Sequence, residues 1–210
     1  MIEACNRHRG RPKASVDSEL RRAIAKVASH LFIQKGYGAT TTEEIAALCK
    51  ISKQTLYRLF TGKSALFAAV IEYSRPQWLD LPVPDGLSLQ AALEFMFRIE
   101  ISEDDDRERR LFLEMALAEG RLYPELKDIL NKSGHEYDHL VLANWLQCQA
   151  DKGFIKLAGD ALNTAYLLTD MVFGSLIRRT ILGSELTREV IWRRHVQLTV
   201  DVFLKGVGLG

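Results

Sequence analysis

Two short helical patterns separated by a tight turn, within residues 41–60, constrain this chain more than any other feature. The first begins with a capping pattern, because Thr41 can accept from an early backbone amide and Glu44 follows three residues later. The second begins at Ser52, a residue type that caps helices well. Two short helices joined so closely predict a helix-turn-helix, whose second helix fits the major groove of B-DNA.

The outward face of the second helix carries side chains suited to phosphates and base edges. Leu56, Leu59 and Phe60 recur at helical spacing and are expected to face inward. The side chains then expected to point outward are Lys53, Gln54, Tyr57 and Arg58. An exposed aromatic among cations is unusual for a face that is merely solvated, so we favour a DNA-reading face over an ordinary helical hairpin.

The flanking segments extend this pattern on both sides. Leu20, Ile24, Val27, Ala28, Leu31 and Phe32 form one stripe of a helix that Gly36 is expected to end. A further helix is expected to open at Lys63. Residues 1–17 are predicted to be a basic arm, in which Arg9, Arg11 and Lys13 can follow phosphates or enter a minor groove.

The order and spacing of these residues resemble the DNA-binding domain of the tetracycline-repressor (TetR) family. The matching residues are Gly36-Tyr37, Thr40-Thr41, Ile45-Ala46, Ser52, Thr55-Leu56-Tyr57, Phe60, Lys63 and Leu66. The chain departs from the family pattern at Lys50, where a turn glycine is usual, and at Leu59, where an aromatic or histidine is common. A left-handed backbone at Lys50 would therefore be less relaxed than in the family.

The resemblance implies an all-α protein with an N-terminal three-helix helix-turn-helix domain and a C-terminal helical domain for ligand binding and dimerisation. We expect the first domain over residues 18–79 and the second over residues 80–210, after a proline cluster. The residues expected to touch DNA, besides those of the arm, are Thr41, Thr42, Ser52, Lys53, Gln54, Thr55, Tyr57, Arg58 and Lys63. Lys53, Gln54 and Tyr57 are assigned to bases or phosphates. The residues assigned mainly to the DNA backbone are Thr41, Thr55, Arg58 and Lys63.

The charge distribution agrees with a nucleic-acid partner. Residues 1–79 hold 13 of the 28 lysines and arginines but only 6 of the 27 aspartates and glutamates, a balance of +7. The remainder, with 15 against 21, has a balance of −6. A basic front half on an acidic back half is typical of a DNA-binding head on a body that does not bind DNA.

The bulk composition excludes several other classes of protein. Cys5, Cys49 and Cys148 are odd in number and far apart, which favours neither a disulfide framework nor a zinc cluster. The start of the chain lacks the apolar core of a signal peptide, and residues 161–177 are too short and polar to span a bilayer. We therefore expect a cytoplasmic protein that has no membrane contact and needs no cofactor.

From Leu87 onward the apolar spacing predicts only helices. They are expected at about 107–121, 124–152, 160–182 and 187–205, with the acidic run at 103–106 as a solvated loop. The resemblance implies a cavity for an unidentified small molecule and a homodimer formed by the last two helices. Candidate cavity residues are Phe95, Phe112, Met115, Tyr137, Trp145, Tyr166 and Met171, and candidate interface residues are Gly174, Ile177, Ile181, Leu198 and Val202.

One motif supports a different function. His135-Glu136-Tyr137-Asp138-His139 matches H-E-x-x-H, in which two histidines on one helix face hold zinc and the glutamate activates water. Because no third ligand stands out, we expect a polar helix face, no metal and no enzyme. The main hypothesis is a homodimeric repressor that a small molecule releases from its double-stranded operator. The alternatives are a zinc-dependent hydrolase and a DNA-binding regulator without a ligand.

Overall fold

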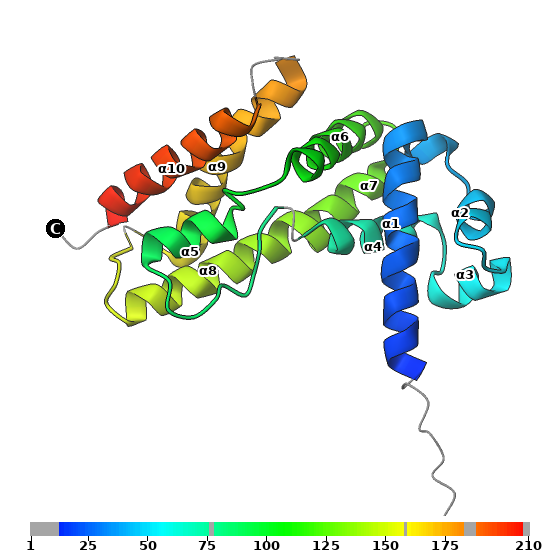
Figure 1. Ribbon diagram of the computed structural model, residues 1–210, viewed down its shortest axis with the longest axis horizontal. Helices are drawn as coiled ribbons and strands as arrows, with labels where there is room; N and C mark the ends of the chain where they lie inside the picture. The colour runs from blue at the N-terminus through cyan, green and yellow to red at the C-terminus, as the bar shows by residue number, and fades with distance from the viewer. Residues whose placement is uncertain (1–12, 76–77, 158, 183–187, 208–210) are drawn as a thin grey trace, which may run out of the picture.

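A computed structural model of the chain describes residues 13–75, 78–157, 159–182 and 188–207. Within these ranges the regular structure is entirely helical, which confirms the all-α prediction. The head consists of α1 (Lys13–Ala39), α2 (Thr42–Leu48), α3 (Lys53–Leu59) and α4 (Lys63–Ser74). In Figure 1, α2 and α3 lie on one side of α1, and the helices of the body lie on the other. Because α1 begins at Lys13, the last residues assigned to the arm are helical.

The predicted caps and turn of the helix-turn-helix are present. Thr41 Oγ1 accepts from Glu44 N, and Ser52 Oγ accepts from Thr55 N. Between the helices, Lys50 adopts a left-handed conformation with φ of 54°. The amides of Lys50 and Ile51 donate to Ala47 and Ala46, which is the Schellman pattern that ends a helix. The turn is thus formed although the residue in it is not glycine.

The head has its own hydrophobic core, which the body helps to complete. The inward-facing residues Leu56, Leu59 and Phe60 are buried, as predicted, in a cluster with Ile24 and Phe32. Leu48 of α2, in contrast, is 57% exposed and lies outside this core. Three residues from beyond position 80 complete the cluster: Phe112, Met115 and Leu126. The head is therefore packed firmly against two helices of the body.

The body comprises α5 (Leu89–Met96), α6 (Glu103–Glu119), α7 (Pro124–Ile129), η2 (Leu130–His135), α8 (Glu136–Asp151), α9 (Ala161–Leu182) and α10 (Arg188–Val207). The single helix expected at 124–152 contains a π-helical turn, η2, between α7 and α8. A second cluster of buried residues joins α5, α8, α9 and α10 around Leu93, Leu146, Leu168 and Trp192. No helix in the described ranges is long and apolar enough to cross a membrane.

The prediction of a solvated loop at residues 103–106 is wrong. These four acidic residues form the first turn of α6, which Ser102 caps by accepting from Asp105 N. Acidic side chains are favoured there because they face the positive end of the helix dipole. Asp106 is also buried, and it pairs with Arg109 at 2.6 Å and with Arg110 at 3.1 Å. The run is therefore part of the folded body.

Candidate nucleic-acid interface and effector cavity

The outward face of α3 presents the polar side chains that the sequence placed there. Lys53, Gln54, Tyr57 and Arg58 are all exposed, on a helix held at its start by Ser52 and Thr55. The side chain of Gln54 is exposed and has no hydrogen-bond partner within the described part of the chain, so its amide can reach a base edge. Tyr57 is tied to α2, because its hydroxyl lies 3.0 Å from Thr42 Oγ1.

Two of the cations on this face form ion pairs with acidic residues of α1 and α2, which were not predicted from the sequence. Lys53 pairs with Glu43 of α2 at 2.9 Å, and this hydrogen bond lowers the pKa of Glu43 to about 2. Arg58 forms a bidentate salt bridge with Asp17 of α1: Nη1 donates to Oδ2 at 2.7 Å, and Nη2 donates to Oδ1 at 2.9 Å. Ion pairs as exposed as these contribute little to stability, so a phosphate can replace the carboxylate. The pairs keep both cations in place on the surface.

Lys63, a predicted DNA contact, is hydrogen-bonded to the protein backbone of the head. Its ammonium donates to the carbonyls of Gly38 and Thr40, at 3.1 and 2.7 Å, and lies over the ring of Tyr37. Burial lowers its pKa. The contact of Lys63 with phosphate stays a prediction, whereas its bonds to the joint between α1 and α2 are a structural feature of the head.

The end of α6, in the body, also contacts the joint between α1 and α2. Glu119 Oε2 accepts from Gly38 N at 3.0 Å, and the ring of Tyr123 packs edge-on against Tyr37, with centroids 5.2 Å apart. Gly36 has φ of 82° and ψ of 161°, and a Cβ on it would lie 2.5 Å from the Glu119 carboxylate. The position of α2 and α3 is therefore linked to the body through Glu119.

Three predicted arm contacts cannot be placed. Arg9 and Arg11 lie outside the described residues, as does Cys5. Lys13 is the first residue of α1, but its side chain is not described. The role of the arm in DNA binding stays a prediction.

A cavity of about 370 Å³ lies between the head and the body. Its walls come from α4, α6, η2, α8 and α9, and include the aromatic side chains of Trp78, Phe112 and Phe173. Its polar side chains include Arg75, Asp138, His139 and Thr169. The volume and the mostly apolar lining with a few polar groups are those of small-molecule sites in proteins.

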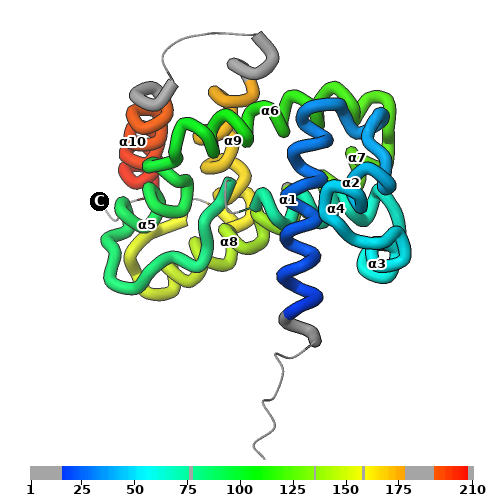
Figure 2. Tube along the Cα trace, turned by 45° about the vertical axis from the view of Figure 1, so that its right-hand side comes forward, coloured from blue at the N-terminus to red at the C-terminus, as the bar shows by residue number. Residues whose placement is uncertain are grey.

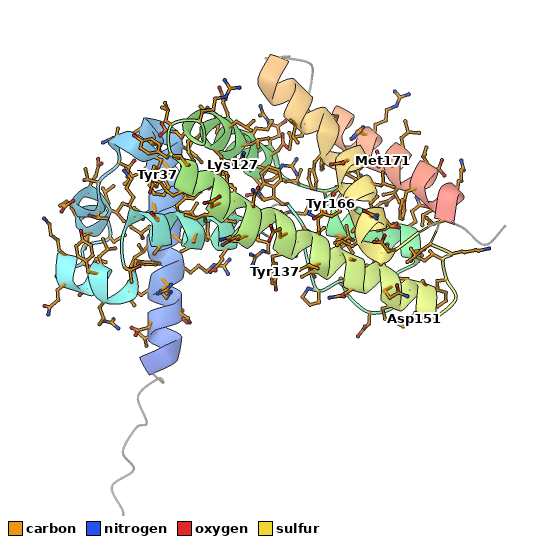
Figure 3. All side chains as sticks on the ribbon, turned by 180° about the vertical axis from the view of Figure 1, so that it is seen from behind. Tyr37, Lys127, Tyr137, Asp151, Tyr166 and Met171 are labelled. Carbon is orange, nitrogen blue, oxygen red and sulfur yellow. The ribbon has the colours of Figure 1, made fainter. Side chains whose placement is uncertain are left out.

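The predicted cavity residues are only partly brought together. Phe112 lines the 370 Å³ cavity, whereas Met115 belongs to the core of the head. Tyr137 and Trp145 line a separate, larger groove of about 910 Å³ between α8 and the segment 81–89. Phe95, Tyr166 and Met171 line neither space, and Figure 3 shows Tyr166 and Met171 on α9. Trp78, Arg75 and Thr169 line the cavity but were not predicted from the sequence, because they carry no recognisable motif.

The H-E-x-x-H segment has a structural explanation. His139 is buried, stacks on Tyr166 with centroids 4.1 Å apart, and places Nε2 2.7 Å from Thr169 Oγ1. The Thr169 hydroxyl donates to a backbone carbonyl, so its oxygen accepts a hydrogen bond from the N–H of His139 Nε2. That nitrogen is not available to a metal. The side chain of His135 is not described, and the described residues contain no group of three metal ligands.

The predicted interface residues lie on exposed faces of the last two helices. Gly174 and Ile177 of α9 are exposed, and both also line the edge of the 370 Å³ cavity. Leu198 and Val202 of α10 are 60% and 50% exposed. Ile181 belongs to α9, but its side chain is not described.

The exposed amide of Gln54 leads to a testable prediction. Replacing Gln54 with alanine should change which bases the protein prefers, because only base-edge contacts carry sequence information. Each good contact of this kind contributes about 1–3 kcal/mol of discrimination. Selection of binding sites from random DNA measures the preference. Gln34→Ala, at an exposed glutamine on α1, is the matched control. An unchanged preference in Gln54→Ala would remove Gln54 from base recognition.

A capped helix pair with a cationic outer face, fixed to a helical body with a cavity, defines a helix-turn-helix regulator. Comparisons with known proteins agree. Residues 24–70 match the family described as bacterial regulatory proteins, tetR family, and residues 104–206 match the C-terminal domain of AefR-like transcriptional repressors. The chain belongs to the TetR family and is a DNA-binding transcriptional regulator.

Individual relatives span most of the chain. YvkB of Bacillus subtilis, an HTH-type transcriptional regulator, is 24% identical over 185 residues, which cover 88% of this chain and 95% of YvkB. RutR of Escherichia coli K12 is 32% identical over 62% of this chain and 63% of its own length. A TetR-family structure from Mesorhizobium loti has a TM-score of 0.69 and 26% identity, covering 92% of this chain and 98% of that one. The flavonoid-responsive regulator FrrA has a TM-score of 0.63 and 28% identity, with coverage of 91% and 98%.

Proposed function

We propose that this protein is a homodimeric cytoplasmic repressor that leaves its operator when a small aromatic molecule occupies the 370 Å³ cavity. The observation that carries the proposal is that the cavity shares its walls with the head. Ile71 of α4 and Phe112 of α6 line the cavity and also belong to the head core. The ring of Phe112 stacks on Phe67 with centroids 5.9 Å apart. A molecule in the cavity would therefore contact α4 and α6, the helices that position α2 and α3.

The exposed apolar side chains of α9 and α10 support the dimer. Leu167, Leu198 and Val202 are each at least half exposed, on the two helices that the family resemblance assigns to the interface. The helices lie side by side at one edge of the body (Figures 1 and 2). Two such helices from each chain would form a four-helix interface, and the resulting two-fold symmetry suits a near-palindromic operator.

The lining of the cavity supports an aromatic effector. Trp78 and Phe173 pack edge-on, with ring centroids 5.6 Å apart, and offer surfaces on which another ring can pack. FrrA, which is similar to this chain over most of its length, is flavonoid-responsive. Release follows if the effector binds more tightly to a conformation in which the two heads no longer match the operator, and such coupling is typically about 1–3 kcal/mol.

Blocking the cavity tests this proposal. No heavy atom lies within 4 Å of a Cβ added to Gly174, which lines the cavity edge. We expect a panel of flavonoids to contain compounds that raise the melting temperature of the wild type and weaken operator binding about 5–150-fold. Gly174→Phe should bind DNA but no longer respond to them.

Gly206→Phe is the matched control, because Gly206 on α10 is equally open but lies outside the cavity. Sedimentation of both variants checks that the dimer persists. If Gly174→Phe responds like the wild type, the effector does not bind in this cavity. If no flavonoid acts on the wild type, the aromatic effector must be abandoned, and a DNA-binding regulator without a ligand becomes the better hypothesis.

A further inference from the structure

Asp138 occupies a distinctive place in the wall of the 370 Å³ cavity. It belongs to α8, and its side chain is only 20% exposed. Its Oδ1 accepts from Arg75 Nε at 2.9 Å. Arg75, the residue after α4, also donates to the Ser133 carbonyl at 2.6 Å, and its guanidinium lies 4.2 Å from the centroid of Tyr137. These contacts fix the orientation of the Asp138 carboxylate.

The second oxygen of this carboxylate is an acceptor that the described residues do not use. Asp138 Oδ2 has no hydrogen-bond partner among them. Burial raises the pKa of Asp138 to about 6, even though Arg75 acts in the opposite direction. The carboxylate is therefore mostly buried yet ionised at neutral pH, and a hydrogen-bond donor in the cavity would stabilise its charged form.

The other polar groups of the cavity are less suited to bind a ligand. His139 and Thr169 are bonded to each other, and the Thr169 hydroxyl donates to the backbone of its own helix. Asp170 is exposed, so water already solvates its carboxylate. Asp138 is thus a carboxylate in the cavity wall that is mostly buried and has one oxygen without a partner among the described residues.

We propose that Asp138 Oδ2 accepts a hydrogen bond from a hydroxyl group on a neutral, flat aromatic effector that packs against Trp78, Phe112 and Phe173. The inference rests on the proposed function and adds the group that selects the effector. A neutral ligand fits because Arg75 already balances the charge of Asp138, and a charged ligand would lose its hydration without a counter-ion. Hydroxylated compounds should therefore bind in preference to the same ring system without a hydroxyl.

The test compares flavone with two monohydroxyflavones that carry the hydroxyl at opposite ends of the ring system. Calorimetry on the full chain at neutral pH gives the affinity for each. A hydrogen bond to a charged group predicts that the wild type binds at least one hydroxyflavone about 10-fold or more tightly than flavone. Asp138→Asn keeps an oxygen for Arg75 but places an NH₂ group where Oδ2 lies, so this preference should fall to about 2-fold or less.

Two further measurements separate the possible failures. Glu136→Gln removes a neighbouring exposed carboxylate outside the cavity and should keep the wild-type preference. Thermal unfolding of Asp138→Asn shows that the variant is folded. If the wild type binds all three flavones equally, or binds none, the inference is overturned. Operator binding by the ligand-free wild type is measured on the same samples, and its absence would instead overturn the proposed function.

Discussion

Raising the salt concentration from about 50 to 200 mM should weaken operator binding about 10³–10⁵-fold, the range for proteins that contact 6–10 phosphates. The reason is the concentration of positive charge in the first 79 residues, which release counterions from DNA when they bind. Fluorescence anisotropy with labelled operator over a salt series measures the slope of log Kd against log salt.

Deleting residues 1–12 should flatten this slope, since it removes Arg7, Arg9 and Arg11 but leaves α1 complete. Each lost phosphate contact lowers the slope by about 0.9. An equal slope in the deletion variant would mean that the arm does not touch phosphate. An affinity of the full chain that does not change with salt would contradict the electrostatic part of the account.

The second large effect is expected at Gly36. Gly36→Ala should destabilise the protein by about 2–5 kcal/mol, for two reasons. Its φ of 82° and ψ of 161° lie in a region that is essentially restricted to glycine. A Cβ there would also displace the Glu119 carboxylate, which then no longer accepts from Gly38 N. The melting temperature should fall by about 5–15 °C, as followed by circular dichroism.

Gly153→Ala is the matched control for this prediction. Gly153 also has a positive φ, of 77°, but nothing lies within 4 Å of an added Cβ. It should therefore lose only the part of the stability that comes from backbone strain, about 1–2 kcal/mol. If both variants unfold at the same temperature, the contact of Glu119 with the joint between α1 and α2 contributes little.

The head could be predicted from the sequence because its determinants are local. Thr41 and Ser52 are capping residues that act on amides three positions away, and the buried stripe of α1 follows helical periodicity. The acidic run at 103–106 was wrongly predicted to be a loop, because a run of like charges is typical of a solvated segment. The pattern Ser102-x-x-Asp105, which resembles the spacing of a capping box, was the local signal that a helix begins there.

The environment of the candidate site depends on contacts between distant residues. Asp17 and Glu43, which hold Arg58 and Lys53, lie 41 and 10 positions away from their partners and carry no motif. Of the seven predicted cavity residues only Phe112 lines the 370 Å³ cavity, because apolar residues in a helical body are more often core than lining. Asp138 lies inside the H-E-x-x-H motif, but its proposed role follows only from its contact with Arg75, the residue after α4.

The central claim is that the exposed face of α3 reads operator DNA as part of a two-fold dimer. Selection of binding sites by the purified wild type from random double-stranded DNA, followed by sequencing, tests it most directly. We expect a near-palindromic motif with half-sites about one helical turn, or a whole number of turns, apart. No enrichment over random DNA at low salt, or a single half-site without symmetry, would contradict the account.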